Sequence, residues 1–598
     1  MPLAAATIAG LSTGSIGLSI TLYRTTLDLY SVFTTASSLG QDAQVLQAQL
    51  LIQETLFKRW GDGLGLTKTN IDDVDERLKS DGEGTLLQAV IVGLSSVRKV
   101  LSDTEKLQKS YGLEGSDEVT FGGQLLVELQ GMTLLDSEVV MTEYQQREKE
   151  AQKMQKRAGI MKKLKWVIKD KEKFGKLVER LTSFNNGLYS LIEPLEASIL
   201  AKAVVGELLR TLDLGRLRIL GTAARTTGNA SDVASLAALR QKAVEAMRYP
   251  ERTPDMELPE KSKGLTLLST ARGCRRTVGN YRSERLAPES TGLVLVEWKI
   301  IESNLTGQEK RLLDTTTNNL AFFLNKKNKS EGLRSLTCIG VTKDVNYSVE
   351  SIRYGFVYKL PDRSSETTTP SSLFDMLGND KFELDLGMTF SIAQTLVQSL
   401  HELHLANWLH KAISSENVLF MQQRGVSRPH WEIPLSSVYL AGYEFSRPGR
   451  LRDPTQPAGD VVRSVYAHPA YRRGNIRYRR LFDIYSLGVV LLEIGLWQRV
   501  VDSIRPGKTA DDIQDFLIGS CEELGPTMGR VYLNAVQSCL KGDFPVEGLD
   551  LYEEAEPNWL EMTADETVAL EVSDEQMNAD LTASFYWKVV QPLRKLYA

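Results

Sequence analysis

Cysteine and histidine are scarce in this 598-residue sequence. The four cysteines lie far apart and the five histidines form no group with metal-ligand spacing, so the sequence shows neither a zinc pattern nor a disulfide framework. Widely separated cysteines fit a reducing, cytoplasmic compartment. We therefore expect no metal site and no disulfides. The cysteines are Cys274, Cys338, Cys521 and Cys539.

Excess charge of either sign is also lacking over the chain as a whole. The net charge is -5, with 42% hydrophobic and 25% charged residues, which is ordinary for a globular protein. The net charge therefore does not indicate any particular class of partner. No DNA- or RNA-binding motif is present, so nucleic acid is not expected as a partner. At this length two or three domains are expected.

The beginning of the chain lacks charged side chains. Residues 2–23 contain none, and Arg24 is the first charged residue. As a helix this segment covers about 33 Å, close to the roughly 30 Å of a hydrocarbon core, and Gly10 and Gly14 form a G-x-x-x-G that allows close helix contact in lipid. The alternative, which we favour for the resting protein, is a small-residue helix buried in a soluble bundle. The membrane-insertion candidates are Leu3, Ile8, Gly10, Gly14, Ile16, Gly17, Leu18 and Ile20.

Apolar residues at helical spacing predict helices from residue 23 to about residue 203. Within them, residues 147–180 carry thirteen Lys and Arg against five Asp and Glu. On one helix with Leu164 and Val167, these form an amphipathic basic surface that attracts anionic lipid. An ordinary solvated helix face is the alternative. The lysines expected to bind lipid or an acidic partner are Lys162, Lys163, Lys165, Lys169, Lys171 and Lys173.

Three features follow one another in the first third of the chain: the uncharged start, RWG at residues 59–61, and KLKW at residues 163–166 followed by Asp170 and Phe174. Together they resemble the fungal HeLo domain, the helical membrane-toxic module of incompatibility and cell-death proteins. The resemblance covers about residues 1–215. It implies an all-α helical bundle that acts on membranes and forms homo-oligomers when activated.

Residues 410–419 (HKAISSENVL) resemble the catalytic loop of protein kinases with its catalytic residue missing. His410 and Asn417 fit the spacing of H-R-D-L-x-x-x-N, but Ala412 stands in place of the aspartate that accepts the substrate proton. Gly442 likewise stands where D-F-G places the magnesium-binding aspartate. Residues 483–493 (DIYSLGVVLLE) are similar to the buried helix of the large kinase lobe. The resemblance implies a bilobal α+β pseudokinase over residues 265–598, with its large lobe at about 361–598.

The stretch that resembles the small lobe, about residues 265–360, lacks a glycine-rich phosphate loop. Lys299 matches the phosphate-pairing lysine, and with Asn417 it is all that remains of a nucleotide site, so we expect no bound ATP. The competing hypothesis is an unconventional, ATP-binding Ser/Thr kinase that uses Glu416 or Glu444 as a displaced acid. Four arginines crowd the place of the missing loop: Arg272, Arg275, Arg276 and Arg282.

A connector separates the two regions at residues 216–264. Two linker-like stretches, 221–231 and 249–263, flank a short expected helix at 232–248. A bundle, a brace-like connector and a pseudokinase resemble, in architecture alone, the mixed lineage kinase domain-like executioners of necroptosis. In those proteins the bundle permeabilises membrane and the pseudokinase restrains it.

Two charged stretches indicate regulation. Residues 447–480 hold nine arginines against two aspartates, a composition that binds phosphate or carboxylate. Residues 542–587 hold thirteen acidic residues and no Lys or Arg; such a block is usually solvated, and docking of residues 147–180 onto it is the alternative. An upstream kinase or receptor is a candidate partner. The expected regulatory residues are Arg463, Arg472, Arg473, Glu553, Glu554 and Glu556.

These features predict a cell-death effector, cytoplasmic at rest and bound to anionic lipids of the plasma membrane when active. The bundle targets and permeabilises the membrane, and the catalytically inactive domain restrains and releases it. A non-catalytic scaffold without membrane activity is the further alternative. Liposome leakage separates effector from scaffold, and magnesium-dependent autophosphorylation separates both from a kinase.

Overall fold

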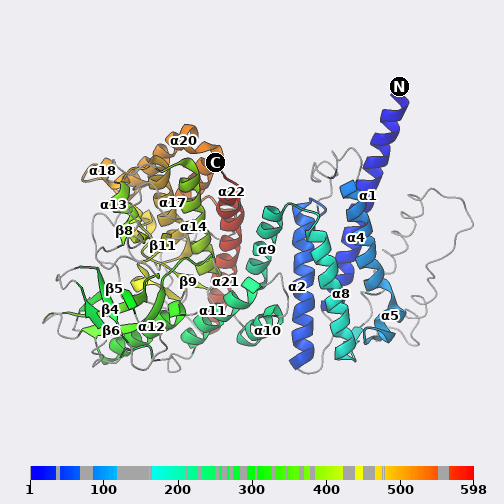
Figure 1. Ribbon diagram of the computed structural model, residues 1–598, viewed down its shortest axis with the longest axis horizontal. Coiled ribbons are helices and arrows are strands. Elements are labelled where there is room, and N and C mark those ends of the chain that lie inside the picture. Colours follow the sequence, from blue (N-terminus) through cyan, green and yellow to red (C-terminus); the bar gives the residue numbers. More distant parts are fainter. Residues whose placement is uncertain are drawn as a thin grey trace, which may run out of the picture. The chain divides into compact units, whose positions relative to one another are not determined.

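The computed structural model describes residues 2–34, 41–67, 78, 85–116, 161, 165–210, 213–225, 231–248, 255–258, 265–268, 274–282, 292–302, 306–325, 332–344, 348, 351–361, 370–377, 384–421, 438–448, 465–473, 476, 478–547, 549 and 564–597. The chain forms two compact units, Met1–Ala234 and Ser235–Ala598. Figure 1 colours the first from blue to cyan and the second from green to red.

Helices make up most of the described part of the first unit (Figure 1). They are α1 (Pro2–Thr34), α2 (Gln41–Gly63), α4 (Thr85–Ser102), α5 (Thr104–Lys109), α8 (Lys171–Tyr189), α9 (Pro194–Leu208) and α10 (Leu214–Arg225). α1 packs against α2 and α4, and α2 also packs against α8, α9 and α10. At the centre, the ring centroids of Tyr23 and Phe57 lie 5.1 Å apart, and those of Phe57 and Trp60 lie 6.1 Å apart. All three side chains are fully buried.

Gly61, near the C-terminal end of α2, lies against Tyr23 of α1, where a Cβ would overlap the tyrosine ring. We expect Gly61→Ala to lower the free energy of unfolding by about 1–3 kcal/mol, the usual cost of overpacking, in a urea titration. Gly187→Ala in α8 is the control, because its new methyl group meets nothing within 4 Å. Equal losses of stability in the two variants would show that the α1–α2 contact is looser than described.

Two short paired strands interrupt the helices of the first unit. β1 (Leu113–Ser116) pairs antiparallel with β2 (Lys165–Ile168). Trp166 and Ile168 are both buried, which is the two-residue period of a strand. Asp170 then caps α8, since its carboxylate accepts a backbone N–H of the first turn at 3.0 Å. The prediction of helix throughout is therefore wrong at β1 and β2, and the prediction of one basic helix across residues 147–180 is wrong at β2, because Trp166 and Val167 pack there as a strand.

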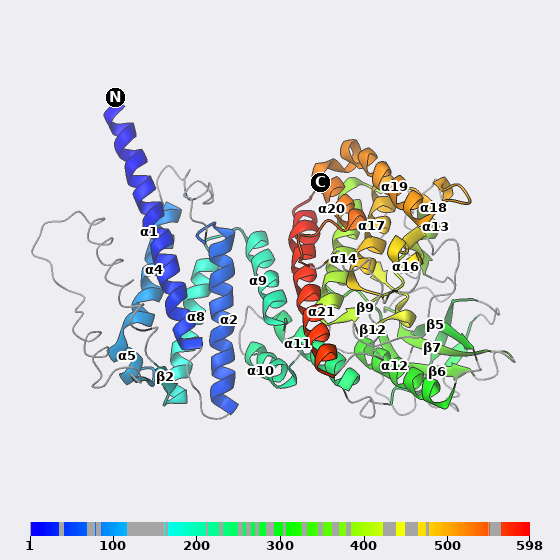
Figure 2. The same cartoon turned by 180° about the vertical axis from the view of Figure 1, so that it is seen from behind.

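A five-stranded antiparallel sheet lies in the second unit, in the order β3-β4-β5-β7-β6. Its elements and the helix beside it are β3 (Leu265–Leu267), β4 (Arg276–Tyr281), β5 (Gly292–Glu302), α12 (Gly307–Asn325), β6 (Thr337–Asp344) and β7 (Ser351–Lys359). α12 packs against β6 (Figure 2). β5 is central and pairs with β4 and β7, so its inward side chains are held at fixed positions.

The remainder of the second unit is mainly helical. Its helices are α11 (Ser231–Arg248, which begins in the first unit), α13 (Leu373–Leu377), α14 (Leu386–Leu405), α16 (Pro469–Arg473), α17 (Arg480–Leu496), α18 (Val500–Ser503), α19 (Ala510–Ser520), α20 (Leu524–Lys541), α21 (Ala564–Phe585) and α22 (Gln591–Arg594). Its short strands are β8 (Ser371–Ser372), β9 (Trp408–Leu409), β10 (Val418–Phe420), β11 (Val438–Leu440) and β12 (Arg447–Pro448). The second unit is therefore a mixed α+β region in which α17 is buried from Arg480 to Ile494.

Candidate functional site

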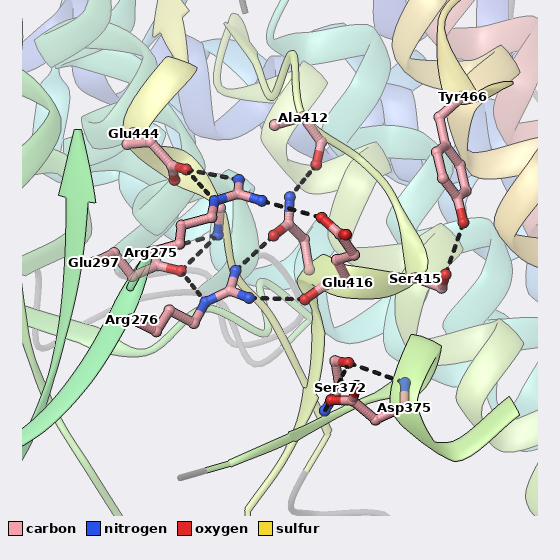
Figure 3. A network of polar contacts seen from close by, with 12 residues as sticks. Arg275, Arg276, Glu297, Ser372, Asp375, Ala412, Ser415, Glu416, Glu444 and Tyr466 are labelled. Atoms are coloured by element: carbon pink, nitrogen blue, oxygen red, sulfur yellow. Dashed lines mark hydrogen bonds and ion pairs between the residues drawn. The ribbon is translucent and has the colours of Figure 1, made fainter. Parts of the chain in front are cut away.

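Two adjacent arginines at the start of β4 face carboxylates from three other segments (Figure 3). Arg275 donates to Glu444 through Nε at 2.9 Å and through Nη2 at 2.6 Å, and its Nη1 lies 3.5 Å from Glu416. Arg276 donates from Nε to Glu297 at 2.8 Å. We call these five residues the arginine cluster. It joins the sheet to the turns at residues 415–417 and 443–445.

Arg276 also holds the loop that resembles a catalytic loop. Its Nη1 donates to the carbonyl oxygen of Glu416 at 2.8 Å, and its Nη2 donates to Asn417 Oδ1 at 2.5 Å. Asn417 Nδ2 in turn donates to the carbonyl of Ala412. The asparagine that we predicted as a remnant of a nucleotide site therefore bonds to the protein itself at both ends of its amide.

The cluster combines two guanidinium groups with three carboxyl groups. Burial alone would raise the pKa of Glu444, but Arg275 and Arg276 outweigh it and hold that pKa below its usual value. Burial raises the pKa of Glu297, and Arg276 offsets only part of this. The side chains of Glu444 and Glu297 are 1% and 2% exposed. Loss of an arginine would therefore leave a carboxyl group buried without its counter-charge.

Gly442 packs directly against the cluster. Its φ of +85° is left-handed, and its N–H donates to the two carboxyl oxygens of Glu297 at 3.1 and 3.2 Å. A Cβ at this position would overlap the side chain of Asn417. An aspartate cannot take this place without displacing its neighbours, so glycine here matches the surrounding geometry.

Asp483 of α17 fixes the backbone of the same loop. Its carboxylate accepts the N–H groups of His410 and Lys411, each at 2.8 Å, and the hydroxyl of Tyr478 at 2.8 Å. Burial would raise the pKa of Asp483, but the His404 side chain hydrogen-bonded to it and the backbone N–H of His410 lower that pKa. The loop therefore has a defined shape, although Ala412 provides no acid in it.

Lys299 lies in β5 two residues after Glu297, on the same side of the strand. It is buried, and its Nζ lies 5.6 Å from the ring centroid of Phe445. The structure thus places Lys299 beside the turn that carries Glu444. Both acids of the kinase hypothesis, Glu416 and Glu444, face Arg275. Sequence reasoning noticed the arginines but missed Glu297, which its two-residue spacing from Lys299 could have revealed.

A second buried network lies beside the loop (Figure 3). The hydroxyl of Tyr466 lies 2.7 Å from Ser415 Oγ and donates to Glu493 at 2.9 Å. Burial raises the pKa of Glu493 to about 7. These bonds attach residues 465–473 to the turn at 415–417, so this part of the arginine-rich stretch 447–480 is fixed to the loop.

The uncharged N-terminal segment is helical, and its described apolar side chains are buried. Ile16, Leu18 and Ile20 are 3%, 5% and 8% exposed, which agrees with the bundle packing that we favoured for the resting protein. None of the described helices combines the length and the apolarity needed to span a bilayer. Among the other candidates, Gly17 is half-buried; Leu3, Ile8, Gly10 and Gly14 lie in α1, and their side-chain environment is outside the described part.

The lysines proposed for lipid binding are only partly within the described residues. Lys169 lies just before α8, Lys171 and Lys173 lie in its first turn, and all three are exposed. Lys169 pairs with Glu114 at 3.0 Å, and the Lys173 ammonium lies 3.7 Å from the capping carboxylate of α8. Lys165 lies in β2, and Lys162 and Lys163 fall outside the described residues.

The expected regulatory arginines differ in their surroundings. Arg473 is exposed and pairs with Asp511 at 2.9 Å, whereas Arg472 is half-buried. Arg480, from the same stretch, is buried and donates to Thr582 Oγ1 at 2.6 Å. This arginine therefore forms part of the protein interior. Four further candidates lie outside the described residues: Arg463, Glu553, Glu554 and Glu556.

Two family models match separate parts of the chain. Residues 10–220 match the HeLo family, described as prion-inhibition and propagation. Residues 359–597 match a domain of unknown function, DUF7580. The N-terminal region is therefore a helical HeLo domain, which confirms the predicted resemblance to that family.

Curated relatives match only short pieces of the chain. A serine/threonine-protein kinase-like protein of Arabidopsis thaliana is 33% identical over 115 residues, which are 19% of this chain and 29% of that protein. A serine/threonine-protein kinase of Candida albicans is 28% identical over 131 residues, 21% and 17% of the two chains. Cyclic GMP-binding protein C of Dictyostelium discoideum is 24% identical over 171 residues, 28% and 6% of the two chains. This chain thus spans less than a third of each relative.

Proposed function

We propose that this protein is a cell-death effector in which the HeLo domain targets and permeabilises membrane and the second unit, acting as a pseudokinase, restrains and releases it. The HeLo match supports the first half of the proposal. The burial of Ile16, Leu18 and Ile20 supports restraint, because a segment that acts in the membrane must first leave the bundle. The resting protein is then cytoplasmic, and its active partners are anionic plasma-membrane lipids and further copies of the chain.

The arginine cluster is the observation that carries the second half. Phosphoryl transfer in kinases needs one carboxylate for the substrate proton and another for magnesium, and Ala412 and Gly442 stand at those two places. Arg275 and Arg276 instead fill the space between the sheet and the loop and neutralise the carboxylates found there. The second unit can therefore keep a closed, kinase-like shape without nucleotide, which suits a regulatory domain.

We expect purified full-length protein to transfer no phosphoryl group from magnesium-ATP to itself or to a general substrate. The physical reason is the absence of both catalytic carboxylates. Incorporation of labelled phosphate is measured beside the Lys299→Ala variant, which should give the same background. Incorporation that disappears in Lys299→Ala would favour the unconventional kinase and would contradict the pseudokinase proposal.

A further inference from the structure

The segment between α11 and the sheet lies along the outer edge of β6. Val341 N donates to the carbonyl of Met256 at 2.9 Å, and Leu258 N donates to the carbonyl of Val341 at 2.7 Å, which forms a parallel bridge. Met256 N also donates to Asn318 Oδ1 of α12 at 2.8 Å. We call residues 255–258 the strap. It satisfies backbone groups of an edge that would otherwise be open to pairing with another strand.

β6 is shaped to receive the strap. Its register shifts between Cys338 and Gly340, and a Cβ on Gly340 would overlap the Leu258 side chain and the Met256 carbonyl. Leu258 is buried in the hydrophobic cluster of the sheet, together with Val296 and others. The strap is thus held by one buried side chain and a few backbone hydrogen bonds, a contact small enough to open locally while the sheet stays folded.

α11 precedes the strap in the chain and contacts neighbouring elements. Arg240 donates to the carbonyl of Leu405 at the end of α14 at 3.1 Å, and Lys242 Nζ lies 5.9 Å from the ring centroid of Phe322 in α12. The next residue of α12, Phe323, stacks on Trp408 at 4.5 Å between centroids. α12 therefore contacts α11, the strap and β9, the strand that leads directly into residues 410–417.

We infer that the strap is a detachable edge strand that helps to fasten α11 to the sheet and helices of the second unit, so that the strap and α11 are released together. α12 joins them, because it binds the strap through Asn318 and α11 through Phe322. This inference rests on the proposed function in one respect, since α11 belongs to the connector through which the second unit would restrain the HeLo domain.

Hydrogen–deuterium exchange of the full-length protein tests the inference with two matched glycine variants. Gly340 and Gly292 have similar φ values, +159° and +143°, but a Cβ on Gly292 meets nothing within 4 Å. We expect Gly340→Ala to speed exchange at least tenfold in the strap and in α11, and Gly292→Ala to change neither. If Gly340→Ala fails to fold, Leu258→Ala opens the same contact without altering the backbone of β6, with the same expected result. Faster exchange in the strap with unchanged exchange in α11 would overturn the inference.

Dye leakage from anionic liposomes, measured on the same variants, separates this inference from the proposed function. Joint release of the strap and α11 without any gain in leakage would uphold the strap and count against the proposed restraint. Leakage that rises while α11 keeps its protection would uphold the effector function and overturn the role of the strap.

Discussion

Replacing Arg275 and Arg276 together by alanine is expected to lower the free energy of unfolding of the second unit by about 3–5 kcal/mol. Removing one partner of a buried ion pair costs this much because the other charge remains buried. Glu444 and Glu297 are in that position, with side chains 1% and 2% exposed. A urea titration followed by tryptophan fluorescence measures the change.

Arg282→Ala is the matched control for this prediction. Arg282 directly follows β4 and is exposed, so its loss should change stability by no more than about 0.5 kcal/mol. Adding Glu444→Gln to Arg275→Ala should recover part of the lost stability, because it removes the uncompensated charge. If the double arginine variant is as stable as Arg282→Ala, the arginine cluster does not stabilise the second unit as proposed.

The contribution of Arg275 should depend on pH. The folded-state pKa of Glu444 is depressed. The ion pair of Arg275 with Glu444 therefore stabilises the folded protein fully at pH values above the unfolded-state pKa of about 4.3. The contribution is lost as the pH falls through the folded-state pKa. The stability difference between the natural protein and Arg275→Ala is therefore expected to be largest near neutral pH and to shrink below about pH 4.

Gly10→Leu/Gly14→Leu is expected to abolish membrane leakage by the activated full-length protein. Bulky side chains prevent the close helix contact that the G-x-x-x-G allows in lipid, and the buried residues Ile16, Leu18 and Ile20 are not themselves substituted. Leakage of a trapped dye from anionic liposomes measures the effect. Gly187→Leu serves as the control, because the Cβ position of Gly187 in α8 meets no other atom within 4 Å. Full leakage by Gly10→Leu/Gly14→Leu would refute the role of α1 in membrane.

Ile16→Asp is a less selective variant than Gly10→Leu/Gly14→Leu. A carboxylate at mid-helix costs about 3 kcal/mol on insertion scales, which favours loss of leakage. However, Ile16 is only 3% exposed in the resting bundle, so an aspartate there also destabilises the resting fold. Deletion of residues 2–23 has the same drawback because it removes Tyr23 from the aromatic core. The glycine pair therefore gives the sharper test.

Local patterns predicted much of the fold. The uncharged segment forms a helix, residues 232–248 lie within α11, and residues 483–493 lie within the buried α17. Each of these depends on apolar spacing or on a short motif that the sequence displays directly. The pairing of β1 with β2 was not predicted, because Lys165 and Lys169 suggest a basic helix. In the structure, Trp166 is buried in the four-residue strand β2.

The partners of the two arginines could not be predicted in the same way. Arg275 and Glu444 are 169 residues apart in the chain, and Arg276 and Asn417 are 141 apart. No periodicity links such positions, and only the folded sheet and loop bring them together. The sequence did show that Ala412 and Gly442 lack carboxylates, but the φ of Gly442 and its contact with Asn417 needed the structure.

Dye leakage from anionic liposomes by full-length Arg275→Lys/Arg276→Lys tests the proposed restraint most directly. Lysine keeps both charges but lacks the forked guanidinium that binds a carboxylate through two N–H groups. The arginine cluster is therefore weakened while the chain stays folded. We expect this variant to release dye from the liposomes faster than the natural protein does. Adding Gly10→Leu/Gly14→Leu to the variant should abolish that release. Equal leakage by the natural and lysine-substituted proteins, both folded by circular dichroism, would contradict restraint of the HeLo domain through the arginine cluster.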